Sequence, residues 1–183
     1  MSRIFLMGMP GSGKTTLGKK LAAKLGLPFI DLDAFIETQE GKTVSEIFEE
    51  RGEAEFRNLE TGYLKSIISE KSTFFLSLGG GTPCYNNNLA LLKENGVTVY
   101  LEVPSLMLID RLNAKGRGSR PLFSGLSNED LKKKIKDMLE KREVFYKQAL
   151  LVLNGKSLKI VSAAGEIAAL LNKGINSDQT KHA

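Results

Sequence analysis

Residues 8–15 have the residue types and spacing of a phosphate-binding loop. They read Gly-Met-Pro-Gly-Ser-Gly-Lys-Thr, which matches the pattern G-x-x-x-x-G-K-[ST]. Glycines let the backbone wrap tightly, so that successive N–H groups point at phosphate oxygens. Lys14 can reach the β- and γ-phosphates, and Thr15 offers a hydroxyl to Mg²⁺. We expect a nucleoside triphosphate to contact Gly11, Ser12, Gly13, Lys14, Thr15 and Thr16.

The rest of the sequence separates the classes of protein that use this loop. A GTPase would carry D-x-x-G and N-K-x-D, and neither string occurs in the chain. The apolar run Phe74–Leu78 ends in three glycines, Gly79–Gly81, which let a ligand approach the backbone closely. This favours a transferase with a small acceptor. A regulatory P-loop binding module is the alternative from a different class.

Two carboxylates follow the second strand-like run. Asp31 and Asp33 are separated by one residue, so on a strand both would face the crevice at the carboxyl end of a parallel sheet. One could position Mg²⁺ through water, and the other could accept the proton of an attacking hydroxyl. Alternatively, Asp33 only caps a helix over Ala34–Glu40.

Two arginines have positions that suit an organic anion. Arg57 and Glu60 are neighbours on a predicted helix, so Glu60 can orient the guanidinium toward a carboxylate; the alternative is a surface ion pair. Arg142 falls in the register of an apolar helical stripe, where it needs an anionic partner unless its stem extends to solvent. That stripe consists of Leu131, Ile135, Met138 and Phe145.

The segment 113–125 is rich in glycine and basic residues, which predicts a mobile cationic lid. Within it, Pro121 favours an extended conformation for Arg120. If the lid closes over the nucleotide, Arg120 can meet the transferring phosphoryl group. The alternative is a charge that stays in solvent.

Apolar runs of strand length alternate with helical patterns, which predicts a parallel sheet covered by helices on both faces. The expected strands are Ile4–Met7, Pro28–Asp31, Thr73–Leu78, Val97–Leu101 and Leu150–Leu153. The expected helices are Lys14–Leu25, Thr43–Ile68, Asn87–Glu94, Ser105–Leu112, Asn128–Lys147 and Ala164–Leu171. We expect one domain over residues 1–172 and an irregular, frayed tail over 173–183.

Composition excludes several other kinds of site. The 183 residues include one cysteine, Cys84, and one histidine, His182, so neither a disulfide within the chain nor a His-based triad is possible. A net charge of +5 suits anionic ligands. The chain lacks the stripe of basic residues interleaved with aromatics that would favour nucleic acid as the partner. Without a leader or a bilayer-length apolar run, we expect a cytoplasmic protein with no membrane partner. We also expect the protein to act as a monomer.

Taken together, these segments resemble the shikimate kinases. The resemblance covers residues 3–172 and follows the family's order. It rests on the phosphate loop, Asp31-Leu32-Asp33, the Phe48–Glu60 segment, Gly79–Gly81, Arg120-Pro121-Leu122, and Lys141-Arg142 with Tyr146. It implies an α/β, three-layer P-loop kinase with a five-stranded parallel sheet in the order 2-3-1-4-5.

The resemblance also implies a reaction and a set of roles. ATP, with Mg²⁺, would phosphorylate the 3-hydroxyl of shikimate in aromatic amino-acid biosynthesis. Asp33 would bind the acceptor hydroxyls and act as base, and Arg57 and Arg142 would hold the carboxylate. The substrate-binding helices would lie at about residues 33–61. Gly79, Gly80 and Gly81 would border the ring of the acceptor. Lys14 and Arg120 would stabilise the phosphoryl group during transfer, and Thr15 and Asp31 would bind Mg²⁺.

The adenine contacts are the part of the family pattern that the spacing leaves open. The family usually places an arginine shortly before the lid to stack on adenine. Here Arg111, Lys115 and Arg117 all compete for that role. A further adenine-contacting loop is expected near Leu153-Asn154-Gly155, but its sequence is not distinctive.

Overall fold

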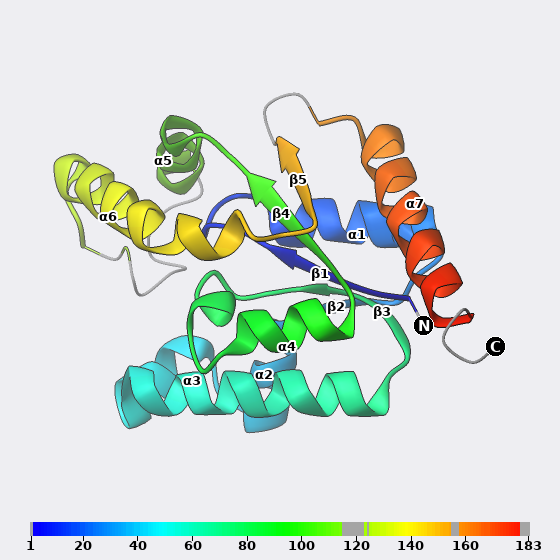
Figure 1. Cartoon of the computed structure of the whole chain (residues 1–183). Coiled ribbons are helices and arrows are strands. Elements are labelled where there is room, and N and C mark those ends of the chain that lie inside the picture. Colours follow the sequence, from blue (N-terminus) through cyan, green and yellow to red (C-terminus); the bar gives the residue numbers. More distant parts are fainter. Residues whose placement is uncertain (1, 115–122, 124, 155–157, 180–183) are drawn as a thin grey trace.

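The computed structural model describes residues 2–114, 123, 125–154 and 158–179 (Figure 1). Five parallel strands form one sheet in the order β2-β3-β1-β4-β5, as expected. The strands are β1 (Ser2–Met7), β2 (Phe29–Asp31), β3 (Thr73–Ser77), β4 (Val97–Glu102) and β5 (Leu151–Asn154). Because all five run the same way, their carboxyl ends share one edge of the sheet.

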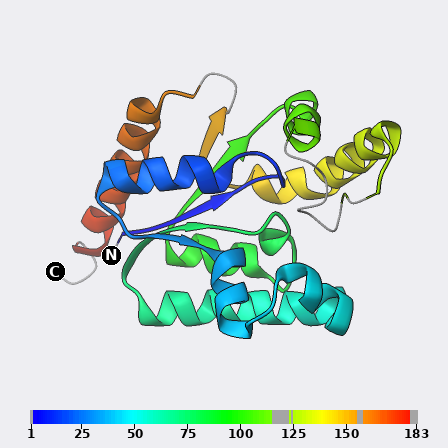
Figure 2. The ribbon, with the colours of Figure 1, turned by 180° about the vertical axis from the view of Figure 1, so that it is seen from behind.

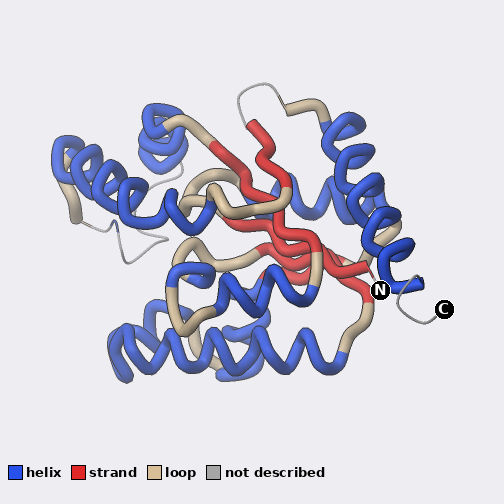
Figure 3. The backbone as a smooth tube through the Cα atoms, viewed as in Figure 1, coloured by secondary structure: helices blue, strands red, loops and turns tan. Residues whose placement is uncertain are grey.

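The helices are α1 (Lys14–Leu25), α2 (Leu32–Glu40), α3 (Val44–Glu70), α4 (Asn88–Asn95), α5 (Ser105–Ala114), α6 (Asn128–Tyr146) and α7 (Ile160–Gln179), with a short 3₁₀ helix, η1 (Thr82–Cys84). Helices α1 and α7 cover one face of the sheet and α4 lies on the other, which is visible in the two opposite views of the ribbon (Figures 1 and 2). The tube view shows the sheet enclosed between these layers (Figure 3).

The central strand explains the three-layer arrangement. In β1, the four residues from Ile4 to Met7 are fully buried, which requires cover on both faces of the sheet. The cover includes Leu21 of α1 and Leu92 of α4, both also fully buried. A sheet packed in this way holds the loops at its carboxyl edge on a rigid base.

Two helix starts differ in their chemistry. Thr43 caps α3 with a capping box, because its hydroxyl accepts from the Glu46 N–H while the Glu46 carboxylate accepts from the Thr43 N–H. The reading of Asp33 as a helix cap is wrong. Strand β2 ends at Asp31, and the Asp31 carboxylate itself accepts the Ala34 N–H at 3.4 Å, so α2 begins at Leu32 and Asp33 lies in its first turn.

Helices α3, α4, α5 and α7 all end later than predicted, and two of these extensions matter most. Helix α5 continues to Ala114, into the start of the expected lid, and α7 reaches Gln179, well into the segment 173–183 that was expected to be irregular. Helix α3 contains one break, at Gly52, whose φ of 79° and ψ of 171° are not helical. The portion after this break carries Glu53, Arg57 and Glu60 on one continuous helix.

Candidate active site

A cavity of about 800 Å³ opens at the carboxyl edge of the sheet. Its walls include the described residues that the sequence assigned to phosphate, an acceptor or a metal: Gly11, Ser12, Gly13, Lys14, Thr15, Thr16, Asp31, Asp33, Arg57, Gly79, Gly80, Gly81 and Arg142. Leu153 and Asn154 of the expected adenine loop are not among the lining residues. The assigned residues that line the cavity come from α1, α2, α3, α6, the end of β2 and the loops after β1 and β3. A single cavity therefore joins the phosphate loop to the arginines.

The phosphate loop has the geometry that its sequence predicts. Gly13 has a φ of 96°, in the left-handed region that glycine tolerates, and α1 begins at the next residue. The Lys14 ammonium donates to the carbonyl oxygens of Gly8 at 3.0 Å and Met9 at 3.1 Å, which holds it across the loop. The buried Ser12 hydroxyl has no hydrogen-bond partner among the described residues. Loop, lysine and helix N-terminus together suit a polyphosphate.

Thr15 and Asp31 form a pair of oxygen ligands beside the loop. The Thr15 hydroxyl donates to the Asp31 carboxylate at 2.7 Å. Mg²⁺ in nucleotide sites is usually held by one or two side-chain oxygens together with phosphates, so this hydroxyl and carboxylate fit that ion. Across the part of the chain that the structure describes, no group of three or more His, Cys, Asp or Glu side chains could hold a metal ion.

Asp33 is an unusually basic carboxyl at the centre of the cavity. Burial raises its pKa to about 6, and the negative charges of Glu60 and Asp31 add to the rise, while the Lys14 ammonium opposes it. The Asp33 and Glu60 carboxylates approach each other beneath Gly79, where an added Cβ would lie 2.8 Å from Asp33 Oδ1 and 2.5 Å from Glu60 Oε1. A carboxyl with this pKa can accept a proton near neutral pH.

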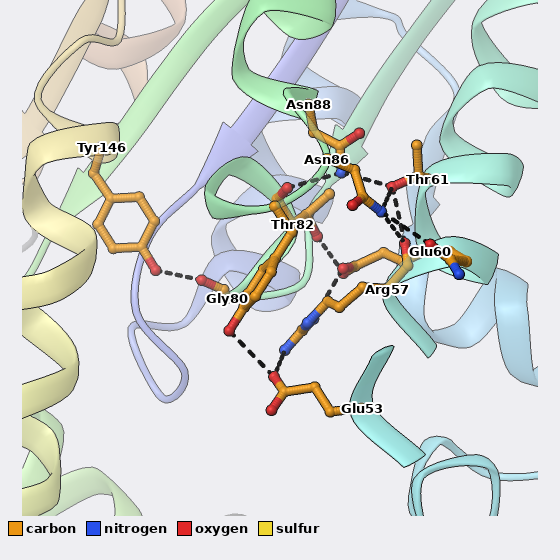
Figure 4. A network of polar contacts seen from close by, with 11 residues as sticks. Glu53, Arg57, Glu60, Thr61, Gly80, Thr82, Asn86, Asn88 and Tyr146 are labelled. Atoms are coloured by element: carbon orange, nitrogen blue, oxygen red, sulfur yellow. Dashed lines mark hydrogen bonds and ion pairs between the residues drawn. The ribbon is translucent and has the colours of Figure 1, made fainter. Parts of the chain in front are cut away.

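Arg57 is held rigidly within a buried network (Figure 4). Its guanidinium donates to Glu60 at 2.9 Å and to Glu53 at 3.0 Å, and Tyr85 covers it with its ring centre 4.5 Å away. Glu60 is completely buried and Arg57 is only 6% exposed, so the reading of a surface ion pair is wrong. Burial disfavours the charge of Arg57, but Glu60 and Glu53 outweigh this effect and raise its pKa.

Each glycine of the run after β3 leaves room for a different neighbour. A Cβ on Gly81 would lie 2.7 Å from the Arg57 guanidinium, and one on Gly80 would lie 2.7 Å from Pro10 of the phosphate loop. With the Gly79 contact described above, the run packs against Asp33 and Glu60, the phosphate loop and Arg57 in turn. Any side chain here would displace one of the three.

Arg142 reaches the cavity from α6, as its register predicts. In that helix Leu131 and Ile135 are fully buried, and Arg142 is partly exposed and lines the cavity. The α6 face therefore presents one cation beside its apolar contacts. Arg57 and Arg142 line the same cavity from different helices, an arrangement suited to a carboxylate.

Comparison with known proteins decides the family. The family described as shikimate kinase matches residues 10–171. A shikimate kinase from Bacteroides fragilis is 42% identical over 97% of this chain and 100% of its own length, and one from Bacteroides thetaiotaomicron is 45% identical over 87% of this chain and 90% of its own. The chain belongs to the shikimate kinase family.

Solved structures agree with this membership. A shikimate kinase crystal structure from Bacteroides thetaiotaomicron has a TM-score of 0.85 at 42% identity, covering 93% of this chain and 98% of the other. A shikimate kinase from Acinetobacter baumannii in complex with shikimate has a TM-score of 0.82 at 33% identity, covering 95% and 94%. A gluconokinase from Sinorhizobium meliloti, with a TM-score of 0.53 at 16% identity, shares the fold alone.

Of the three adenine candidates in this shikimate kinase family member, the structure describes only Arg111. Its guanidinium donates to the Ser12 carbonyl oxygen at 2.6 Å and lines the cavity beside the phosphate loop. Lys115, Arg117 and the predicted lid arginine Arg120 lie outside the described residues, as does Gly155 of the expected adenine loop. Within the described residues, no helix combines the length and the apolar character needed to cross a membrane.

Sequence reasoning missed the residues that support the acceptor end of the cavity. Thr82 donates its hydroxyl to Glu60, and Asn88 donates to the Thr61 hydroxyl and the Thr82 carbonyl (Figure 4). Asn86 donates to the Arg57 carbonyl at 3.1 Å from a left-handed turn with a φ of 49°. The run Asn86–Asn88 signals a turn in the sequence, but nothing there reveals which helix it contacts.

Proposed function

We propose that this chain transfers the γ-phosphoryl group of ATP to the 3-hydroxyl of shikimate, forming shikimate 3-phosphate in aromatic amino-acid biosynthesis. The observation that carries this proposal is the single cavity in which a phosphate loop faces two arginines across a buried carboxyl. Membership of the shikimate kinase family supports the same reaction.

The arginines would fix the acceptor through its carboxylate. Arg57 keeps its orientation through Glu60 and Glu53, and its buried Nε–H has no acceptor among the described residues. Arg142 supplies a second positive charge from α6. Binding the carboxylate far from the reacting hydroxyl would orient that hydroxyl for in-line attack. The ring would then lie along Gly79, Gly80 and Gly81, where no side chain intervenes.

Asp33 would act as the base. As the 3-hydroxyl oxygen attacks the γ-phosphorus, its proton moves to the Asp33 carboxylate, and ADP leaves with the electrons of the broken β–γ bridge. A pKa of about 6 leaves Asp33 mostly ionised at pH 7 while giving it more proton affinity than an ordinary aspartate. Glu60 and Asp31 supply the negative field that maintains this affinity.

Lys14 would neutralise the β- and γ-phosphates, and the backbone N–H groups of Gly11, Ser12 and Gly13 would hold their oxygens. Thr15, and Asp31 through water, would hold Mg²⁺, which would offset the negative charge of the phosphates. We assign Arg120 to the transferring phosphoryl group from the family resemblance alone. We further propose a monomer that acts in the cytoplasm.

The test is a coupled ADP-release assay with ATP, Mg²⁺ and a panel of acceptors: shikimate, gluconate and several nucleoside monophosphates. We expect saturable turnover with shikimate and background rates with the others. Preferred turnover of gluconate or of a nucleotide would refute the assignment of the acceptor and leave only the phosphate-loop chemistry.

A further inference from the structure

Tyr146 is a buried residue of the family pattern to which the mechanism above gives no role. It is the last residue of α6 and is completely buried. Its hydroxyl donates to the carbonyl oxygen of Gly80, the middle glycine of the run that borders the acceptor (Figure 4). The end of α6 is therefore tied directly to the floor of the cavity.

The same side chain also contacts the phosphate loop and the sheet. The Tyr146 hydroxyl lies 3.9 Å from the sulfur of Met9, and the ring stacks on Tyr100 of β4 with centroids 5.1 Å apart at an angle of 27°. Gly80 itself sits against Pro10 of the phosphate loop. One phenol thus lies where α6, the glycine run and the phosphate loop meet.

Arg142 precedes Tyr146 by four residues, so the two share one face of α6. Burial raises the pKa of the Tyr146 phenol far above its usual value, and the positive charge of Arg142 opposes this rise. The phenol therefore keeps its proton, and remains a hydrogen-bond donor, at neutral pH. A shift of α6 that broke the bond to Gly80 would also carry Arg142 away from the acceptor.

We propose that Tyr146 is a positioning residue: its hydroxyl anchors α6 to Gly80 and thereby sets the distance between Arg142 and the acceptor ring. This inference rests on the proposed function, because it takes Arg142 to be a carboxylate-binding residue. Tyr146 itself touches neither substrate. It acts on shikimate through Arg142, because its bond to the Gly80 carbonyl holds α6 in place.

Tyr100 provides a matched control within the same stack. It is a tyrosine with 1% of its surface exposed, and its ring faces that of Tyr146. Its surroundings differ, because it lines a separate cavity of about 240 Å³ with Glu102 and Glu143, away from the active-site cavity. Tyr100→Phe therefore reports the effect of removing a buried phenol oxygen without touching the glycine run.

The experiment compares Tyr146→Phe and Tyr100→Phe, each of which keeps the aromatic stack. Leaving the buried Gly80 carbonyl without its donor is expected to raise the KM for shikimate about tenfold in Tyr146→Phe. The KM for ATP should stay within about twofold of the value for Tyr100→Phe, because the phosphate loop loses only the weak contact between Tyr146 and the Met9 sulfur and keeps its hydrogen bonds to Lys14. Equal changes in the two KM values, or equal effects of the two variants, would overturn the proposal.

A double-mutant cycle with Arg142→Ala tests whether Tyr146 acts through Arg142. Shikimate affinity is measured by calorimetry for the wild type, both single variants and the double variant. If the phenol positions Arg142, Tyr146→Phe should weaken binding by less than about twofold once Arg142 is absent. Independent, multiplying effects would mean that Tyr146 only contributes to packing.

The same cycle separates this inference from the proposed function. If Arg142→Ala leaves shikimate affinity unchanged, the carboxylate-binding role of Arg142 fails, and the positioning role fails with it. If Arg142→Ala weakens binding strongly while Tyr146→Phe matches Tyr100→Phe, only the positioning role fails. Thermal unfolding of each variant, with its KM for ATP, shows whether the variant is folded and identifies any loss due to stability alone.

Discussion

Substitution of Thr82 by Val removes one hydroxyl from the acceptor end of the cavity while preserving the shape of the side chain. That hydroxyl donates to Glu60 Oε1, and the other Glu60 oxygen accepts from Arg57 at 2.9 Å. Both Thr82 and Glu60 are completely buried, so water cannot replace the lost donor. Glu60 must then move toward another donor or bind a proton, and either change releases Arg57 from its orientation.

The size of the effect follows from the charge of the acceptor. A buried hydrogen bond to a charged group contributes about 1.5–3 kcal/mol. Part of this loss is expected as a decrease in Tm of about 5 °C for a domain of this size. The remainder should appear as a rise of about tenfold in the KM for shikimate, with the KM for ATP unchanged, because Arg57 contacts only the acceptor end of the cavity.

Steady-state kinetics and thermal unfolding on three variants provide the measurement. Thr82→Ser keeps the hydroxyl and should recover most of the shikimate affinity. Thr98→Val is the matched control, since Thr98 is a completely buried threonine of β4 whose hydroxyl accepts from the Leu150 N–H at 3.1 Å, outside the cavity. It should lower the Tm without changing either KM. If Thr82→Val and Thr98→Val have the same KM for shikimate, the argument that Thr82 holds Glu60 and Arg57 in place is refuted.

Three further predictions concern Arg57 and Asp33. Arg57→Ala should raise the KM for shikimate at least about 30-fold while leaving ATP affinity nearly unchanged by calorimetry, since a bidentate charged contact is lost; equal weakening of both ligands would make Arg57 structural. Asp33→Asn should abolish most turnover, and its Tm should exceed that of the wild type at pH 8 but not near pH 4. The folded state binds the Asp33 proton more tightly than the unfolded chain, with a pKa of about 6 against 3.8, so ionisation lowers stability as pH rises through this window, by on the order of 3 kcal/mol. For the wild type, kcat/KM for shikimate should fall about tenfold per pH unit below about pH 6, and an acid limb near pH 4 would contradict the burial of this carboxyl.

Features determined by local spacing could be predicted from the sequence. The phosphate loop needs only its own eight residues, and the pairing of Arg57 with Glu60 follows from their separation on one helix. The strand order was inferred from the resemblance to the family, and the sheet confirms it. Register along α6 also placed Arg142 correctly at the cavity.

Features that depend on distant segments could not be predicted. The burial of Glu60 requires Thr82 and the glycine run to cover it, and these lie on a different part of the chain. The end of β2 at Asp31 was predicted correctly, but the start of α2 was placed at Ala34 instead of Leu32. Asp31 and Asp33 both suit a helix cap, and only the backbone decides which one accepts the Ala34 N–H. The contact between Tyr146 and Gly80 likewise joins residues whose proximity no periodicity reveals.

The distribution of the cavity walls over the chain has a consequence for how the protein resists unfolding. Asp33 lies early in the chain, Gly79–Gly81 near its middle and Arg142 late, and they meet only when the whole sheet is assembled. No fragment of the chain can hold the acceptor, so shikimate has affinity for the complete native state alone. Saturating shikimate should therefore slow global unfolding, and with it proteolysis in elements that do not line the cavity, such as α4.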